Sequence, residues 1–142
     1  MEVTKSSFDL DFSYGHEGEK LVEQLLTNGR TVEVKRDRKW HQTGNVYIEI
    51  ECWYLKSESW EPSGLSVTQA DYWAFVLEDM VIMLPTESLR YAIRNFGHEI
   101  TCDIPPNKSK GYLITIENLL ATTKLLRKAN QNEISRPNQG AM

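Results

Sequence analysis

Hydrophobic and polar positions along the chain follow two periods, one typical of helices and one typical of strands. Residues 16–27 have helical spacing, with an apolar stripe made of Leu21, Val22, Leu25 and Leu26. Asn28 and Gly29 both tolerate a left-handed backbone, so they predict the end of that helix. Residues 31–37 and 46–53 alternate with a period of two and are separated by a polar turn. This pattern predicts a helix followed by a β-hairpin.

The rest of the chain alternates between shorter helical and strand-like segments. Thr68, followed three residues later by Asp71, is typical of a helix start. The elements predicted after the hairpin are a polar loop at 54–65, a helix at 68–79, strands at 80–84 and 100–104, a helix at 87–95, an edge strand at 112–116 and a helix at 117–128. Their order predicts an α/β (α+β) fold in which a mixed central sheet is flanked by helices. Residues 1–129 are expected to form one domain, and residues 130–142 a disordered tail.

The composition is that of a soluble globular protein, with 142 residues, 40% hydrophobic and 25% charged, and a net charge of −4. No apolar run approaches the roughly 20 residues that a membrane helix needs. The first residues lack the pattern of a signal peptide, so the cytoplasm is the expected location. Cys52 and Cys102 are too few for a disulfide framework or a zinc site.

Charged side chains occupy one face of each predicted hairpin strand. Glu33, Lys35 and Asp37 alternate along the first strand, and Glu49 and Glu51 alternate along the second. Carboxylates clustered around a lysine suit a divalent cation and phosphodiester hydrolysis, because the cation neutralises the charge that develops on the phosphate oxygens. Magnesium usually takes one or two protein carboxylates and keeps several waters. The hairpin is therefore the candidate active site.

The order of helix, hairpin, helix and strand, with acids at these points, resembles the core of the PD-(D/E)XK nuclease superfamily over residues 9–94. The resemblance implies a restriction-endonuclease-like core and a Mg²⁺ (or Mn²⁺) ion bound by an aspartate and a glutamate on neighbouring strands. Asp37 and Glu49 match these two positions. The family's lysine, two residues after the glutamate, is replaced here by Glu51. Either Lys35 on the neighbouring strand takes its role, or Glu51 itself binds metal or water.

Two of these assignments have alternatives. Glu33 and Lys35 form a literal E-x-K pair, which would make Glu33 a metal ligand and move the site to the first strand. That alternative needs an upstream aspartate, and a whole helix separates the available ones from the strand. The family often adds a glutamate from the first helix. On a helical wheel Glu19 lies slightly nearer the apolar stripe than Glu17, so Glu19 is the favoured candidate.

Basic residues beside the predicted acids would supply the contacts with DNA. Arg36, Arg38 and Lys39 are interrupted only by Asp37, and such residues provide most of the affinity for phosphate. Thr68 and Gln69 begin the next predicted helix, where related nucleases present polar groups to DNA. The resemblance thus implies a metal-dependent endonuclease that hydrolyses DNA in a bacterial or phage-infected cell. A homodimer is expected, because cutting both strands needs two sites.

Simpler explanations exist for the same residues. Alternating acids are often the solvated face of a hairpin, and Lys35 opposite a glutamate is an ordinary cross-strand pair. A cap alone explains Thr68. Two other functions are therefore kept open: a catalytically inactive nucleic-acid-binding or structural protein on the same fold, and an unrelated α+β interaction module.

Overall fold

The computed structural model describes residues 7–27, 29–104 and 107–135. The chain divides into two units, Met1–Thr31 and Val32–Met142, and each is described by itself.

The first unit contains one helix, α1 (Ser7–Thr27). The predicted helix at 16–27 is confirmed, and it begins nine residues earlier. Leu21 and Val22, half of the predicted apolar stripe, are about half exposed.

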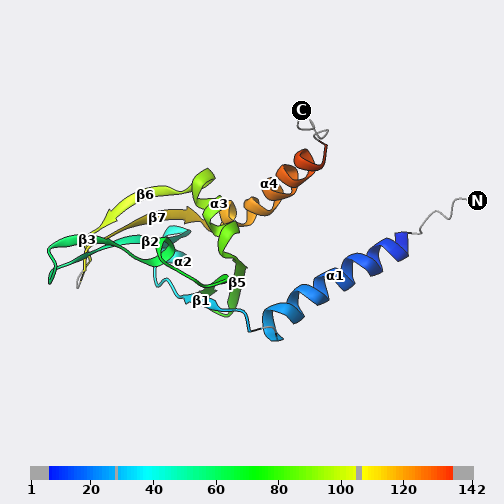
Figure 1. Ribbon diagram of the computed structural model, residues 1–142, viewed down its shortest axis with the longest axis horizontal. Coiled ribbons are helices and arrows are strands. Elements are labelled where there is room, and N and C mark those ends of the chain that lie inside the picture. The colour runs from blue at the N-terminus through cyan, green and yellow to red at the C-terminus, as the bar shows by residue number, and fades with distance from the viewer. Residues whose placement is uncertain (1–6, 28, 105–106, 136–142) are drawn as a thin grey trace, which may run out of the picture. The chain divides into compact units, whose positions relative to one another are not determined.

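The second unit contains two sheets and three α-helices (Figure 1). Its elements in chain order are β1 (Val32–Lys35), α2 (Trp40–Thr43), β2 (Asn45–Tyr54), β3 (Ser59–Pro62), the short 3₁₀ helix η1 (Gly64–Ser66), β4 (Tyr72–Leu77), β5 (Met80–Pro85), α3 (Thr86–Phe96), β6 (His98–Cys102), β7 (Ser109–Thr115) and α4 (Ile116–Ser135). One sheet has the strand order β1-β4-β5 and the other β3-β2-β7-β6. The predicted α+β class, with sheets flanked by helices, is confirmed.

The predicted β-hairpin is wrong, because its two strands belong to different sheets. β1 pairs in parallel with β4, whereas β2 pairs antiparallel with β3 and β7. The residues between them form the helical turn α2, which ends at Gly44 with a φ of 72°. Such a left-handed position is one that glycine adopts at little cost. Alternation in a sequence shows which residues share a face, but it does not identify the partner strand.

The predicted helix at 68–79 is also wrong. Its central residues, Tyr72–Leu77, form β4, and the chain then turns through Glu78, which has a φ of 53°. The segment is rich in aromatic and β-branched residues and lies between β1 and β5, which favours a buried strand. The hydroxyl of Thr68 accepts a hydrogen bond from the Ala70 amide, so it stabilises a local turn and starts no helix.

Most of the remaining predicted elements are present. The strands expected at 80–84 and 100–104 are β5 and β6, the latter shifted toward the N-terminus, and the helix expected at 87–95 is α3. The strand expected at 112–116 is β7, but it lies inside the sheet, between β2 and β6. β3 forms within the predicted loop at 54–65. Helix α4 continues to Ser135, so the first six residues of the predicted disordered tail are helical, and the rest lie outside the described residues.

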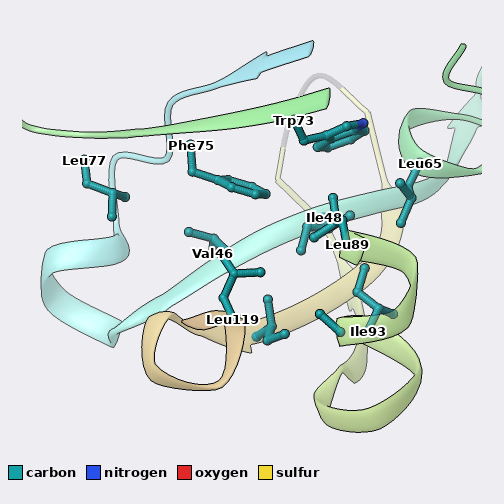
Figure 2. Close-up of a cluster of buried hydrophobic side chains, with 11 residues drawn as sticks. Val46, Ile48, Leu65, Trp73, Phe75, Leu77, Leu89, Ile93 and Leu119 are labelled. Carbon is teal, nitrogen blue, oxygen red and sulfur yellow. The ribbon is translucent and has the colours of Figure 1, made fainter. Parts of the chain in front are cut away.

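The hydrophobic core joins both sheets to α3 and α4. Figure 2 shows side chains from β2, β4, α3 and α4 pointing toward one another around Trp73 and Phe75. Its members are Val46, Ile48, Leu65, Trp73, Phe75, Leu77, Leu89, Ala92, Ile93, Ile114 and Leu119. Burying each large apolar side chain contributes about 1.5–3 kcal/mol. The core holds β2 and β4 together, and a hydrogen bond from the Tyr47 amide to Asp37 joins the start of β2 to the loop after β1, where the candidate site lies.

No helix in the described part of the chain combines the length and the apolar character needed to span a membrane.

Candidate functional site

The lysine expected at the active site is held within its own strand. Lys35 Nζ lies 2.7 Å from a carboxylate oxygen of Glu33, and 5.3 Å from the centre of the Trp73 ring. Glu33 lies opposite Trp73 in the parallel pair, and Lys35 lies opposite Phe75, so both face the side of the sheet that carries the core. The pair is about 40% exposed. Glu33 and Lys35 therefore neutralise each other beside an aromatic ring.

Asp37 serves as a backbone acceptor. It lies in the loop after β1, where one carboxylate oxygen accepts a hydrogen bond from the Lys39 amide at 2.7 Å. The other oxygen accepts from the Tyr47 amide at 3.3 Å. Hydrogen bonds to a charged acceptor are stronger than neutral ones. Asp37 thus ties the loop to the beginning of β2.

Glu49 and Glu51 do not share a face of β2, contrary to the prediction. The pairing with β7 shifts between them, so that Glu49 lies opposite Gly111 and Glu51 opposite Lys110. A bulge of this kind reverses the alternation of side chains that follow it. Glu49 accepts a hydrogen bond from the Ser63 hydroxyl at 2.7 Å.

Glu51 lies on the opposite face and forms an ion pair with Lys110 at 3.5 Å. The Lys110 ammonium also lies 4.2 Å from the centre of the Trp60 ring. Both charged side chains are about one-third exposed. The pair is therefore part of the surface of the four-stranded sheet, and among the described residues no second carboxylate forms an ion pair with Lys110.

The metal site formed by Asp37 and Glu49 stays a prediction, and a larger cluster of metal ligands is absent from the described residues. Among them, no three histidine, cysteine, aspartate or glutamate side chains lie close enough to hold a metal ion. Asp37, Glu49 and Glu33 each have a different partner, as described above. Glu19, with Glu17, belongs to the separate first unit, where both are exposed on α1.

The basic residues after β1 have no such partners. Arg36, Arg38 and Lys39 are exposed, and within the described part of the chain none of them forms an ion pair. We call residues 36–39 the basic loop. Asp37, at its centre, keeps the backbone in place through its two hydrogen bonds. The loop therefore presents three unpaired cations from a fixed backbone.

Two pockets border the basic loop, and Arg36, Asp37 and Arg38 line both. The larger, of about 520 Å³, is the sheet pocket, which extends onto the four-stranded sheet. The smaller, of about 450 Å³, is the tryptophan pocket, lined also by Trp40, Val76 and Glu78.

The sheet pocket has basic residues on one side and an apolar wall on the other. Lys35 and Lys39 line it together with the arginines of the basic loop. The wall comes from strands far apart in the sequence, and its residues are Tyr47, Leu113, Ile100, Cys102 and Ile104. Tyr47 lies opposite Leu113 across β2 and β7, and Cys102 lies opposite Ser109 across β6 and β7. Thr43 and Asn45 add polar groups at the start of β2.

Tyr47 is fixed by its surroundings. A Cβ atom at Gly111 would lie 2.7 Å from two carbons of the Tyr47 ring, so the ring occupies the space that a side chain would fill. The Tyr47 and Ser109 hydroxyls form a hydrogen bond of 2.8 Å. Burial raises the pKa of the Tyr47 phenol above its ordinary value, and the hydrogen bond with Ser109 partly opposes this. The hydroxyl is therefore neutral near pH 7.

The structure brings together some predicted site residues and separates others. Lys35, Asp37 and the cations of the basic loop surround one pocket, whereas Thr68 and Gln69 line a separate pocket of about 260 Å³ near the start of α3. The apolar wall of the sheet pocket was not predicted. Its only signal in the sequence is Tyr47, an aromatic residue that alternates with acids along β2.

Comparisons with protein families, with curated proteins and with solved structures find no match to this chain. What the site does is therefore inferred from its own geometry.

Proposed function

We propose that this protein binds nucleic acid through the basic loop. The observation that carries the proposal is that Arg36, Arg38 and Lys39 are exposed on a fixed backbone, and no described residue forms an ion pair with them. Cations of this kind gain binding free energy from phosphate groups by releasing condensed counterions. The chain as a whole carries a charge of −4, so the attraction is local to this loop.

The two pockets favour an extended polyanion over a single small anion. Arg36 and Arg38 line both pockets, so one strand bound along the loop would reach both of them. One pocket contains Tyr47 and the other Trp40. Proteins that bind single strands combine a positive groove with aromatic side chains in this way.

The positions of the acids favour binding without hydrolysis. Each acid expected at the active site has another partner, and the described residues contain no group that could hold a metal ion. Cleavage of DNA with Mg²⁺ or Mn²⁺ stays a prediction that the experiment below also tests. A homodimer is not required, because one chain supplies the whole loop and both pockets. The homodimer, like the choice between DNA and RNA, stays a prediction.

The test is a titration of fluorescent single-stranded DNA and RNA with the full chain, followed by anisotropy over a range of salt concentrations. The variant Arg36→Gln, Arg38→Gln, Lys39→Gln removes the charge of the loop. A matched control, Lys124→Gln, Arg127→Gln, Lys128→Gln, removes the same charge from exposed positions on α4. Each sample is also incubated with Mg²⁺ or Mn²⁺ and inspected for cleavage.

We expect the loop variant to bind at least about tenfold more weakly than the wild type at low salt, because each exposed charge pair contributes up to about 1 kcal/mol. The slope of log Kobs against log salt should become less steep by about 2, since three phosphate contacts are lost. The α4 variant should bind like the wild type. Equal weakening in both triple variants would overturn the proposal, because it would show a general effect of charge.

A further inference from the structure

We propose that the sheet pocket holds one unpaired nucleobase, which makes the protein selective for single-stranded or flipped-out nucleotides. The inference rests on the proposed function and specifies which part of the nucleic acid the protein recognises, namely a base. It depends on the pocket wall, whereas the proposed function depends on the charge of the basic loop.

The size and lining of the pocket suit a base. Its volume of about 520 Å³ lies in the range of small-molecule sites, which is about 300–1,000 Å³. Tyr47, Leu113 and Ile100 provide an apolar wall on the sheet, where the Tyr47 ring lies over Gly111. A base placed there would leave water and lie against an aromatic ring and aliphatic groups. Such contacts tolerate any base, since every base has a π face.

Polar groups at the rim of the pocket can meet the edge of the base. The amide nitrogen of Asn45 donates to the Thr43 carbonyl at 3.4 Å, which leaves the amide oxygen of Asn45 available as an acceptor. The Tyr47 hydroxyl is already paired with Ser109 and keeps its ring in place. The apolar wall therefore supplies most of the contact, and Asn45 supplies a point that can accept from an N–H group on the edge of a base, such as N3–H of thymine.

Charge complementarity places the phosphate of the same nucleotide at the mouth of the pocket. Lys39 and Arg38 line the pocket and are both exposed, so a phosphate in solvent can reach them. A base in a duplex is stacked on its neighbours and paired with the opposite strand. To reach the pocket wall it would have to leave the duplex, which costs the free energy of that stacking and pairing. Single strands avoid this cost, and the pocket therefore selects them.

An anion with an acyl chain has a similar chemistry and is the main competing occupant. Two observations favour a nucleotide: the polar groups of Thr43 and Asn45 beside the wall, and the second pocket with Trp40 across the same loop. A fatty acid would use neither. The experiment below therefore includes decanoate.

Cys102 reports directly on occupancy, because it lines the pocket and is partly exposed, whereas Cys52 is 6% exposed. The wild-type chain is treated with a maleimide, and the rate of Cys102 modification is measured by mass spectrometry. The ligands are a thymidine oligomer, an abasic strand of the same length, a duplex and decanoate. Cys52, buried on β2, is the internal control.

We expect the thymidine oligomer to slow Cys102 modification at least about tenfold, and the abasic strand and the duplex to leave it within about twofold while still binding the loop. Protection by the abasic strand equal to that by thymidine would overturn the inference. Protection by decanoate and not by thymidine would also overturn it, in favour of an acyl ligand.

A pocket-filling variant gives an independent readout. Ile100→Trp places a large ring against the wall, and Thr101→Trp is the matched control, because Thr101 is exposed on the opposite face of the same strand. We expect Ile100→Trp to weaken binding of the thymidine oligomer at least about tenfold and to leave duplex binding unchanged, with no effect of Thr101→Trp. Equal affinity of Ile100→Trp and wild type would overturn the inference. The proposed function would still stand if the loop variant alone lost binding.

Discussion

Charged side chains on the sheets and charged side chains on the basic loop have opposite surroundings. On the sheets, Glu33 is paired with Lys35 at 2.7 Å, and Glu51 is paired with Lys110 at 3.5 Å. On the basic loop, three exposed cations have no ion-pair partner among the described residues. Alternating acids along a strand can each form an ion pair with a lysine of the same sheet, so they need no bound cation. The cations that have no ion-pair partner are the ones that an anion can bind.

The same comparison explains why the two regions respond differently to substitution. A partly exposed ion pair contributes about 0–1 kcal/mol to stability, since solvent screens it. An unpaired surface cation contributes little to folding, yet it gains a partner when a phosphate binds. The sheet should therefore be sensitive to changes in packing, and the basic loop to changes in charge.

The largest of the effects predicted below is the loss of stability from Gly111→Ala, inside the four-stranded sheet. The new Cβ would lie 2.7 Å from the Tyr47 ring and closer still to the Ile48 carbonyl oxygen. Overpacking of this kind costs about 1–3 kcal/mol, and the backbone contact places this site near the upper end. Thermal denaturation measures the loss. Gly18→Ala, which meets no atom within 4 Å, is the control and should not destabilise. Equal melting temperatures for Gly111→Ala and the wild type would contradict the packing of Tyr47.

The next largest effect is expected from Asp37→Ala, which removes the tether between the basic loop and β2. Two amides lose their charged acceptor, so stability should fall by about 2 kcal/mol. Binding should weaken as well, because the loop loses its fixed backbone. Asp79→Ala removes the same charge from an exposed turn and is the control. An Asp37→Ala chain as stable as the Asp79→Ala chain would show that Asp37 is not a structural acceptor and would revive its role as a metal ligand.

A smaller effect is expected from Asn45→Asp, which places a carboxylate beside the cations of the basic loop. The lysines of the two sheets already have such a carboxylate partner. The new carboxylate lines the sheet pocket together with Arg38 and Lys39. It should weaken nucleic-acid binding about fivefold, the equivalent of about 1 kcal/mol, and leave the melting temperature nearly unchanged. Anisotropy titration measures this change. The control is Asn130→Asp, at an exposed position on α4. Tighter binding by Asn45→Asp would rule out an anion at this position.

The smallest effect is expected from Glu51→Gln, because its ion pair with Lys110 is partly exposed. Stability should change by less than about 0.5 kcal/mol, and nucleic-acid binding should not change. A double-mutant cycle with Lys110→Gln measures the coupling free energy between the two side chains. If the wild type cleaves nucleic acid and Glu51→Gln alone does not, Glu51 takes part in the cleavage reaction and is more than the ion-pair partner of Lys110.

Several elements could be predicted from the sequence because the information for them is local. The first helix is predicted by its helical spacing of apolar residues, and β5 by a short continuous apolar run. Pro85 and Thr86 predict where β5 ends and α3 begins. The basic loop could be recognised as a candidate phosphate contact from its composition alone.

The pairing of β1 with β4 and the wall of the sheet pocket could not be predicted, because they depend on long-range partners. The same alternation in β1 fits an antiparallel hairpin with β2 and a parallel pair with β4. The bulge between Glu49 and Glu51 also has no local signal, yet it separates the two acids onto opposite faces. The helix at 68–79 is predicted from Thr68 and Asp71, which look like a helix start, whereas Tyr72–Leu77 form a strand because they are mostly buried between β1 and β5.

One measurement tests the central claim most directly: the basic loop, and not the set of acids on the two strands, carries the function. A fluorescent single strand is mixed with Mg²⁺ and with wild type, the loop variant (Arg36→Gln, Arg38→Gln, Lys39→Gln) or an acid variant (Glu33→Gln, Glu49→Gln, Glu51→Gln). Anisotropy reports binding, and electrophoresis of the same samples reports cleavage. We predict binding by wild type and the acid variant, at least about tenfold weaker binding by the loop variant, and an intact strand throughout. Cleavage by the wild type that disappears in the acid variant would contradict the account and establish a metal-dependent nuclease.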